Sequence, residues 1–298
     1  MPRDLLIAIT AGLGGMLGWG TADFSAKKAI DQIGDIVSLV WAHVAGSLAL
    51  LLFLGFELGS AAVPVTLPST PLLWLGVAFF GALQAAVYLF VYIGFGKGQV
   101  SVLNPLFASF SGFVAIISIV FLGEHVGGYL AAALAALFAG ILLVSLDATA
   151  LQRRQIKIAN APGLPEIAVA TALAVCWTVG WNAFVSAKDG LSFAIWMYFA
   201  MTLTLLVYAL AVRVPLRFRA RKVWLYLVLI GLCEALGYVA ISVGYARTGH
   251  TSVVALLSGA FPLPTLLLAR VFLRERISAA QRIGGLAIVG AVALLALF

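Results

Sequence analysis

Long apolar runs, separated by short polar or Gly/Pro-marked breaks, extend along the whole chain. A hydrocarbon core about 30 Å thick is crossed by about 20 helical residues, so apolar runs of this length predict membrane-spanning helices. We expect ten of them, at residues 5–25, 36–57, 72–95, 101–121, 127–146, 166–187, 192–212, 223–245, 251–272 and 280–297. The pattern therefore predicts an all-α polytopic membrane protein.

Composition supports this assignment. Hydrophobic residues make up 63% of the 298 residues and charged residues only 10%, whereas an average soluble domain has about 25% charged residues. The first apolar run lacks the basic flank and the cleavage site of a signal peptide, so we keep it as a helix. Cys176 and Cys233 fall inside expected helices, where thiols pack as small apolar groups. They predict neither a disulfide nor a metal site, and we expect no cofactor.

The positive charges lie on one side of the expected helices. Of the 18 Lys and Arg residues, all but Arg3, Lys188 and Arg247 lie in segments that follow odd-numbered helices. Cytoplasmic loops of membrane proteins are enriched in these residues. We therefore expect the odd-numbered loops to be cytoplasmic, both termini to lie outside, and the chain to be a multi-pass protein of the cell (inner) membrane. Cations spread over separate loops do not predict a nucleic-acid partner.

The two halves of the chain repeat the same features in the same order. VFLGEHV at 120–126 corresponds to VFLRERI at 271–277, and a Gly-rich final helix follows each copy. We therefore divide the chain into a first five-helix repeat, a polar connector and a second repeat, at 1–146, 147–164 and 165–298. Because five is odd, homologous halves would enter the membrane in opposite directions, as the inverted repeats of secondary transporters do around a central binding site.

Further motifs connect the chain to a known family. The first helix of each half has a GW…K pattern, in GWGTADFSAK at 18–27 and GWNAFVSAK at 180–188. The fourth helix of each half contains small residues and proline, FL-x-E follows it, and the fifth is rich in glycine. This organisation resembles the EamA-type branch of the drug/metabolite transporter (DMT) superfamily, and within it the YddG-like exporters of aromatic amino acids.

The resemblance implies a fold and an activity. Members export small metabolites by alternating exposure of a central cavity to the two sides of the membrane. The cavity would be lined mainly by helices one, three, four, six, eight and nine, with the fifth helix of each half more peripheral. The resemblance does not define the substrate, because the branch transports amino acids, nucleosides and toxic cations.

Two acidic residues in the expected helices require an explanation. Glu234 lies near the middle of its helix, where a charge costs at least about 2.5 kcal/mol, so it is a functional candidate. It would bind a substrate ammonium or carry a coupling proton; the alternative is a carboxyl that joins two helices by hydrogen bonds. For Asp23, near the end of the first helix, we expect an i,i+4 ion pair with Lys27.

Polar and aromatic residues follow helical spacing in the third and eighth helices. The two sets that recur every three or four residues are Gln84, Tyr88, Tyr92 and Phe95, and Glu234, Tyr238, Ser242 and Tyr245. Within a membrane such a face meets other helices or a wet cavity, where rings could stack on a planar substrate or bind an ammonium. Packing or interfacial anchoring is the alternative.

The remaining substrate-binding candidates lie in the first and fourth helices of each half. The resemblance places the first helices near the pathway, and prolines loosen the fourth ones. The candidates are Trp19, Trp177, Trp181, Asn182, Asn104 and Ser258.

Proline and glycine mark special points in these helices. Pro105, Pro262 and Pro264 each remove an intrahelical hydrogen bond, which makes them gating candidates, although kinks are also common packing features. Gly14 and Gly18 form a GxxxG pattern, which predicts close helix packing.

These observations favour a transporter of amino acids, aromatic ones first, with the small-molecule substrate and the lipid bilayer as partners. The alternatives are a proton-coupled exporter of toxic cations, with Glu234 as the coupling carboxylate, and a channel. Three histidines, His43, His125 and His250, lie far apart, and no metalloprotease, phosphate-loop or paired-carboxylate motif occurs. We therefore do not expect an enzyme.

Overall fold

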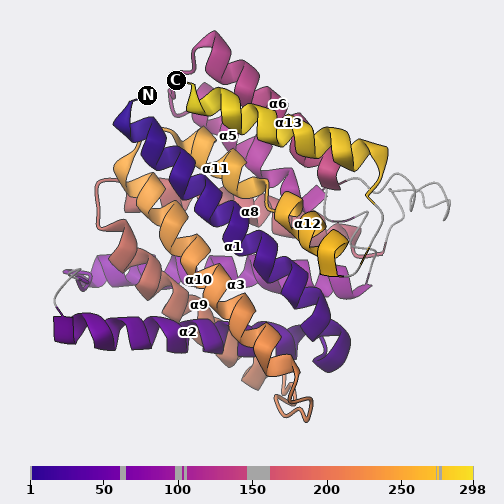
Figure 1. The fold of residues 1–298 in the computed structure, drawn as a ribbon. Helices are drawn as coiled ribbons and strands as arrows, with labels where there is room; N and C mark the ends of the chain where they lie inside the picture. The colour runs from indigo at the N-terminus through magenta and orange to yellow at the C-terminus, as the bar shows by residue number, and fades with distance from the viewer. Residues whose placement is uncertain are drawn as a thin grey trace.

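The computed structural model describes residues 2–60, 65–97, 103, 106–145, 162–272, 274 and 277–297, and all regular structure in this part of the chain is helical (Figure 1). The helices are α1 (Arg3–Ile33), α2 (Asp35–Ser60), α3 (Pro71–Lys97), α5 (Phe110–Val120), α6 (Gly128–Ser145), α8 (Leu164–Val185), α9 (Gly190–Ala211), α10 (Val223–Arg247), α11 (Thr251–Gly259), α12 (Pro262–Phe272) and α13 (Ala279–Ala296).

The expected spans are present in the described part of the chain. Nine helical segments there are long and apolar enough to cross a membrane, with α11 and α12 together forming one span. The fourth expected span, 101–121, is described as a shorter apolar helix from Leu106 to Val120. The protein is therefore an all-α polytopic membrane protein, as the hydrophobic pattern predicts.

Local signals in the sequence set several helix ends. Gly34 joins α1 to α2 with a φ of 86°, a left-handed conformation that glycine adopts without strain. Asp189 caps α9, because its side chain accepts a hydrogen bond from the Ser192 backbone N–H. Ser278 and Gln281 form a capping box at the start of α13.

The contacts between the two halves are approximately symmetric: the main contacts recur between the equivalent helices when the two halves are interchanged. The first helix of each half packs against the third helix of the other, as α1 with α10 and α8 with α3. The second helices also cross to the opposite third helices, as α2 with α10 and α9 with α3. The fourth and fifth helices meet their own counterparts, as α5 with α11 and α6 with α13. This arrangement is that of two inverted five-helix repeats, and α1 begins at the same end of the bundle at which α13 ends (Figure 1).

Glycines allow the closest of these crossings. A Cβ atom at Gly18 would lie 2.5 Å from the Cys233 carbonyl oxygen of α10, and one at Gly14 would lie 2.7 Å from the Ala240 Cβ. A larger residue at either position would push α1 and α10 apart. The predicted GxxxG packing is confirmed.

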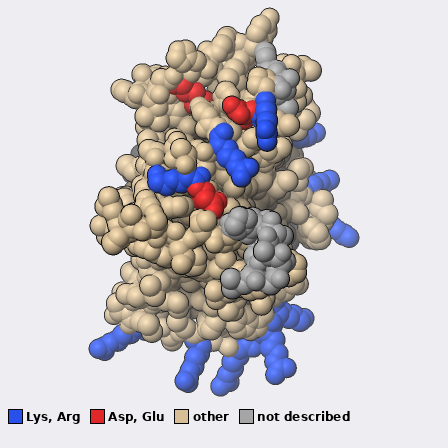
Figure 2. Space-filling model, turned by 90° about the vertical axis from the view of Figure 1, so that its left-hand side faces the viewer, with Lys and Arg blue, Asp and Glu red and all other residues tan. Residues whose placement is uncertain are grey.

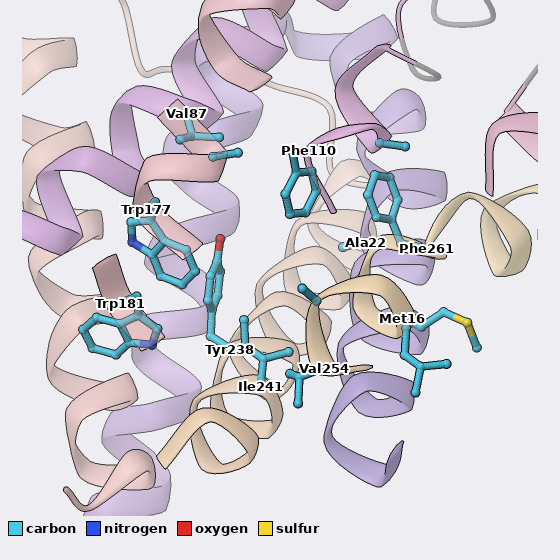
Figure 3. Packing of buried hydrophobic residues seen from close by; sticks show 14 of the residues in the cluster. Met16, Ala22, Val87, Phe110, Trp177, Trp181, Tyr238, Ile241, Val254 and Phe261 are labelled. Carbon is cyan, nitrogen blue, oxygen red and sulfur yellow. The ribbon is translucent and has the colours of Figure 1, made fainter. Parts of the chain in front are cut away.

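The bundle has an apolar interior and an apolar outer surface. Trp177, Trp181 and Tyr238 are fully or almost fully buried at its centre (Figure 3). Leu52, which is 77% exposed, belongs to a large set of exposed aliphatic and aromatic side chains. Lipid chains are as apolar as leucine, so an outer surface of this kind is stable only inside a bilayer.

Candidate functional site: a central cavity

A cavity of about 360 Å³ lies between the two halves, within the size range of small-molecule sites, about 300–1,000 Å³. It is lined from α1, α3, α8, α10, α12 and the residues around the start of α5, which are the helices that the family resemblance implies. The fifth helices, expected to be peripheral, contribute Val144 and Ser145 of α6 and Gln281 of α13. They therefore take part in the wall.

Along the helix axes, the cavity extends from the middle of the bundle to only one of its two ends. Its lining on α1 begins at Trp19 and on α3 at Gln84, and it extends to Lys27 and Lys28 near the end of α1 and to Gln281 near the start of α13. Among the described lining residues, none belongs to α11 or to the first half of α1. The cavity thus extends toward the end of the bundle that carries the basic loops.

Aromatic rings form its inner wall. Tyr238 lies at the centre of this group, with its ring centroid 5.4 Å from Trp19 and 5.7 Å from Trp177, both in edge-to-face geometry. The hydroxyl end of Tyr238 and the Trp177 ring lie beside each other in Figure 3. Tyr88 and Tyr92 line the cavity from α3, with their ring centroids 6.3 Å apart. These side chains offer flat surfaces and ring edges to a planar solute.

Two buried polar atoms on residues of this wall have no hydrogen-bond partner in the part of the chain that the structure describes. Gln84 Nε2 donates a hydrogen bond to the Tyr238 hydroxyl, at 2.5 Å, whereas Gln84 Oε1 is buried without a partner in the described part of the chain. The same is true of Trp19 Nε1. Because buried polar groups are nearly always hydrogen-bonded, an unpartnered acceptor and donor on two lining residues are candidates for contacts with a bound solute.

Charged groups lie nearer the mouth. Asp23 is half-buried and lines the cavity. The expected ion pair of Asp23 with Lys27 is wrong, because Lys27 Nζ lies 2.5 Å from Asp31 Oδ1 instead. Helical geometry allows either pairing, and the Asp31 side chain lies on the exposed side with Lys27. Among the described residues, neither Asp23 nor Lys28 has an ion-pair partner.

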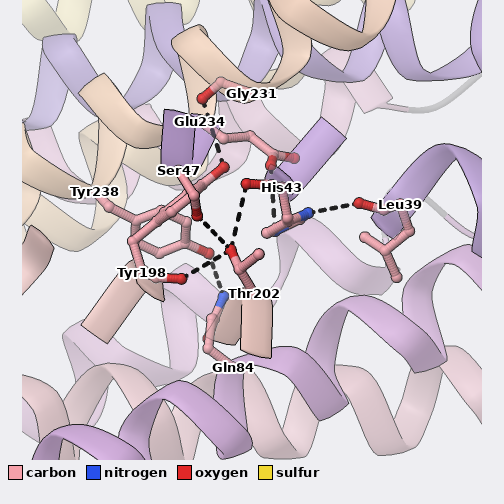
Figure 4. Close-up of polar contacts among 9 residues, drawn as sticks. All are labelled: Leu39, His43, Ser47, Gln84, Tyr198, Thr202, Gly231, Glu234 and Tyr238. Atoms are coloured by element: carbon pink, nitrogen blue, oxygen red, sulfur yellow. Dashed lines mark hydrogen bonds and ion pairs between the residues drawn. The ribbon is translucent and has the colours of Figure 1, made fainter. Parts of the chain in front are cut away.

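Glu234 lies behind the cavity wall, paired with His43 of α2. Glu234 Oε2 is 3.4 Å from His43 Nε2, and the two side chains are 2% and 0% exposed (Figure 4). His43 Nδ1 lies 2.9 Å from the Leu39 carbonyl oxygen. A carbonyl oxygen only accepts, so Nδ1 carries a proton.

This tautomer leaves one proton to be shared by Glu234 and His43. Neither His43 Nε2 nor Glu234 Oε2 has a hydrogen-bond partner among the described residues. An ionised carboxylate facing the lone pair of a neutral imidazole would set two acceptors against each other and bury a charge without a cationic partner, which is very costly. The pair therefore consists either of a carboxylic acid that donates to Nε2 or of an imidazolium beside a carboxylate.

Tyr88 connects this pair with the cavity. Its ring meets the His43 ring edge-on with centroids 5.2 Å apart, and its hydroxyl is within reach of the Glu234 carboxyl. The Tyr198 ring stacks on the His43 ring with centroids 5.4 Å apart. The pair is thus enclosed by tyrosines, and Tyr88, which lines the cavity, is one of them.

The cavity contains half of the substrate-binding candidates. Trp19, Gln84, Tyr88, Tyr92, Trp177 and Tyr238 line it, and so does the gating candidate Pro262.

The other candidates lie elsewhere. Trp181 donates a hydrogen bond to the Ser242 hydroxyl beyond the cavity, and the Ser258 hydroxyl donates to the Ala255 carbonyl. Asn182 is half-exposed and Pro264 packs on Gly20. The candidates Asn104 and Pro105 lie outside the described residues.

The ninth span is interrupted beside the cavity. α11 ends at Gly259 and α12 begins at Pro262, whose ring and missing N–H interrupt the helix, and the Thr265 hydroxyl donates to the Gly20 carbonyl oxygen of α1. Phe261, at the break, lines the cavity with Pro262 and Thr265. The break between α11 and α12 confirms the prediction that proline interrupts the backbone of this span.

The opposite end of the bundle is closed. All residues of α11 are buried, and Glu124 accepts hydrogen bonds from the Ser252 backbone N–H at 2.9 Å and from the Ser252 hydroxyl at 2.5 Å. Glu124 therefore joins the first half to the start of α11 in the second. These contacts give Glu124 a structural role between the two halves.

Comparison with known proteins supports these observations. The sequence profile described as "EamA-like transporter family" matches residues 6–146 and 164–297. A crystal structure with 16% sequence identity aligns over 97% of this chain and 98% of its own with a TM-score of 0.75, which shows a shared fold. No curated protein matches the chain.

Proposed function

Since the chain belongs to the EamA-like transporter family, whose members move small molecules across membranes, we propose that it exports small amphipathic metabolites, aromatic amino acids first. Export would proceed by alternating access of the central cavity between the two inverted halves. The membrane would be the cell (inner) membrane, with the basic loops in the cytoplasm. The cavity would then receive its substrate from the cytoplasm, as an exporter requires.

The lining of the cavity carries this proposal. Aromatic rings form the inner wall, and two of its residues carry a buried donor, Trp19 Nε1, and a buried acceptor, Gln84 Oε1, that have no partner among the described residues. Asp23 and Lys28, nearer the mouth, offer one charge of each sign. A zwitterion with a planar side chain matches all three features, since its ammonium and carboxylate would face Asp23 and Lys28 and its ring would enter the aromatic wall.

The test is uptake of labelled phenylalanine and tryptophan into liposomes that contain the purified protein. We expect saturable uptake that excess unlabelled tryptophan inhibits and excess glutamate does not. Saturation and competition also distinguish a carrier from a channel. Absence of flux above protein-free liposomes for both amino acids would contradict the proposed substrate.

The pair of Glu234 and His43 favours a second candidate, proton-coupled export, with toxic cations as the alternative substrate. A buried pair that shares one proton changes charge whenever it loses or gains one, and Tyr88 links it to the cavity. The unpaired Asp23 carboxylate and the tyrosine rings would attract a cationic solute. In this candidate Glu234 is the coupling carboxylate, and protons move opposite to the exported solute.

Imposed pH gradients test the coupling. We expect a gradient to raise the initial uptake rate of the wild type several-fold and Glu234→Gln to lose this stimulation while retaining exchange without a gradient. Glu166→Gln is the matched control, because Glu166 pairs with Lys97 at the end of α3 and neither residue lines the cavity. Stimulation that persists in Glu234→Gln would exclude coupling through this residue. Inhibition of tryptophan uptake by a lipophilic cation such as tetraphenylphosphonium would favour the cation substrate.

A further inference from the structure

The segment 212–222 between α9 and α10, which we call the strap, begins and ends in turns, and over 214–220 its residues alternate between half-buried and exposed. Its alternate residues Val214, Leu216, Phe218 and Ala220 pack against the core, whereas Arg213, Arg217, Arg219 and Arg221 are exposed. Alternate side chains of an extended chain point in opposite directions and recur about every 6.5 Å on each face. Three of the arginines, at 217, 219 and 221, therefore stand in a row on the outer face.

Aromatic contacts hold this strap in place. Trp41 of α2 donates a hydrogen bond from its Nε1 to the Leu216 carbonyl oxygen at 2.9 Å. The rings of Trp41, Phe218 and Trp224 form a cluster in which the Phe218 centroid lies 6.2 Å from Trp41 and 5.1 Å from Trp224, and the two tryptophans are 5.2 Å apart. The outward direction of the arginines is thus fixed by packing on the inner face of the strap.

The charges of the strap are uncompensated. Residues 212–222 contain four arginines and Lys222 but no acidic residue, and none of these five cations forms an ion pair with any described residue. Lys and Arg side chains project from the bottom of the molecule in Figure 2, the level at which Figure 1 shows the segment between α9 and α10. No acidic side chain is visible beside them there (Figure 2).

The position of the strap defines which anion it can reach. It connects the end of one membrane span to the start of the next, so it lies at the bilayer surface. Tryptophans are enriched at the headgroup level, and a shallow hollow is lined by Trp41, Leu216, Arg217, Phe218, Arg219 and Trp224. The enrichment of cations on one side of a membrane protein explains on which side the arginines lie. It does not explain their alternation along a strap anchored by aromatic rings.

We propose that the 212–222 strap binds the headgroups of anionic phospholipids, with the exposed arginines on the lipid phosphates and the Trp41, Phe218 and Trp224 cluster at the glycerol and upper acyl region. Arginine pairs with phosphate through two parallel hydrogen bonds, and several cations at an anionic leaflet act together. The strap is a lipid-binding site separate from the central cavity.

Native mass spectrometry of the full chain in detergent tests this site directly. The protein is titrated with phosphatidylglycerol and, separately, with phosphatidylcholine of the same acyl chains. We expect tighter binding of phosphatidylglycerol, and an affinity about tenfold weaker in the double variant Arg217→Gln and Arg219→Gln. The matched control is Arg3→Gln with Arg247→Gln, which removes the same charge from exposed positions elsewhere and is expected to retain the wild-type affinity. Thermal unfolding of each variant verifies that it is folded.

Three results would overturn the proposal. Equal binding of the two lipids would show that the arginines do not select the anionic headgroup. An equal loss in the control variant would show a dependence on net charge alone. Full displacement of phosphatidylglycerol by millimolar glycerophosphoglycerol, or by a short RNA, would show that the strap binds a soluble anion rather than a lipid surface. None of these measurements depends on transport, so they are independent of the proposed substrate.

Discussion

At the level of single residues, Gln84 is a proposed substrate contact whose side chain also supports a neighbouring residue. Its Nε2 supports Tyr238 by a hydrogen bond, while its Oε1 has no partner among the described residues and lies in the cavity wall. An unsatisfied buried acceptor lowers stability unless something occupies it. A substrate N–H group is suited to that role.

Replacement of Gln84 by methionine, which has a similar length, is expected to raise the KM for tryptophan about two- to tenfold, because a neutral hydrogen bond contributes roughly 0.5–1.5 kcal/mol. Initial rates of uptake into liposomes measure this change. Ser118→Ala is the control, since Ser118 also has a buried hydroxyl without a described partner but does not line the cavity. An unchanged KM in Gln84→Met would exclude a substrate contact at this residue.

Periodicity predicted part of the cavity wall at this scale. Gln84, Tyr88 and Tyr92 follow one another by single helical turns, so their common face could be predicted before the helices were placed. His43 could not be found this way, because its partner Glu234 is far away in sequence and they meet only when α2 packs on α10. The partner of Lys27 was predicted wrongly, since i,i+4 spacing fits both Asp23 and Asp31 and the sequence does not show which one faces the cavity.

At the level of helices, the closed end depends on a contact between α11 and the segment before α6. Glu124 accepts two hydrogen bonds from Ser252 at the start of α11. Burial raises the pKa of the Glu124 carboxyl above its ordinary value, and the hydrogen bonds from Ser252 only partly offset this effect. Alternating access requires this end to open, which would expose Glu124 to water and return its pKa toward the ordinary value.

The sign of the pH effect follows from this difference in pKa. The Glu124 carboxyl has the higher pKa when this end is closed, so closing is accompanied by proton uptake. Lowering the pH from the raised pKa toward the ordinary value of about 4.5 therefore favours the closed state. We expect a cysteine at the buried position Val254 to react more slowly with an impermeant maleimide as the pH falls through this range. The rate is taken relative to Ser186→Cys, an exposed position, with Cys176 and Cys233 replaced by alanine.

Glu124→Gln is neutral at every pH and is expected to make this labelling ratio independent of pH. A pH dependence of the same size in Glu124→Gln would show that another group controls the closed end. The group to examine would then be His250, which faces the Glu124 carboxyl from the residue before α11.

The spans themselves were accessible from the sequence, whereas several of their ends were not. α1 was expected to end at 25, where polar residues begin, but it continues to Ile33. Its last turns carry Lys27, Lys28 and Asp31, which are helical outside the apolar run because Gly34 ends the helix. Apolar length defines the part of a helix in the bilayer, and capping residues define the helix.

At the level of the whole molecule, the proposed alternating access requires that one cavity can open to either side of the membrane, and the matching contacts of the two halves would allow this. The cavity extends to Lys27, Lys28 and Gln281 at one end, and the buried α11 closes the other. Since the two halves are inverted copies, an equivalent set of contacts with the roles of the halves exchanged would close the first end and open the second. The repeat was visible in the sequence from the order of its motifs. Which end is open depends on side-chain packing between the halves, and no sequence pattern records it.

The most direct measurement of the central claim is exchange of labelled tryptophan in liposomes by the wild type and two variants of α12. Ala269 lines the cavity near its mouth, whereas Leu267 of the same helix is 51% exposed on the outer surface. We predict saturable exchange by the wild type and Leu267→Trp, and loss of at least nine-tenths of the rate in Ala269→Trp, because the indole would fill the mouth. Exchange that is undiminished in Ala269→Trp, or absent in the wild type, would contradict transport of this substrate through the cavity.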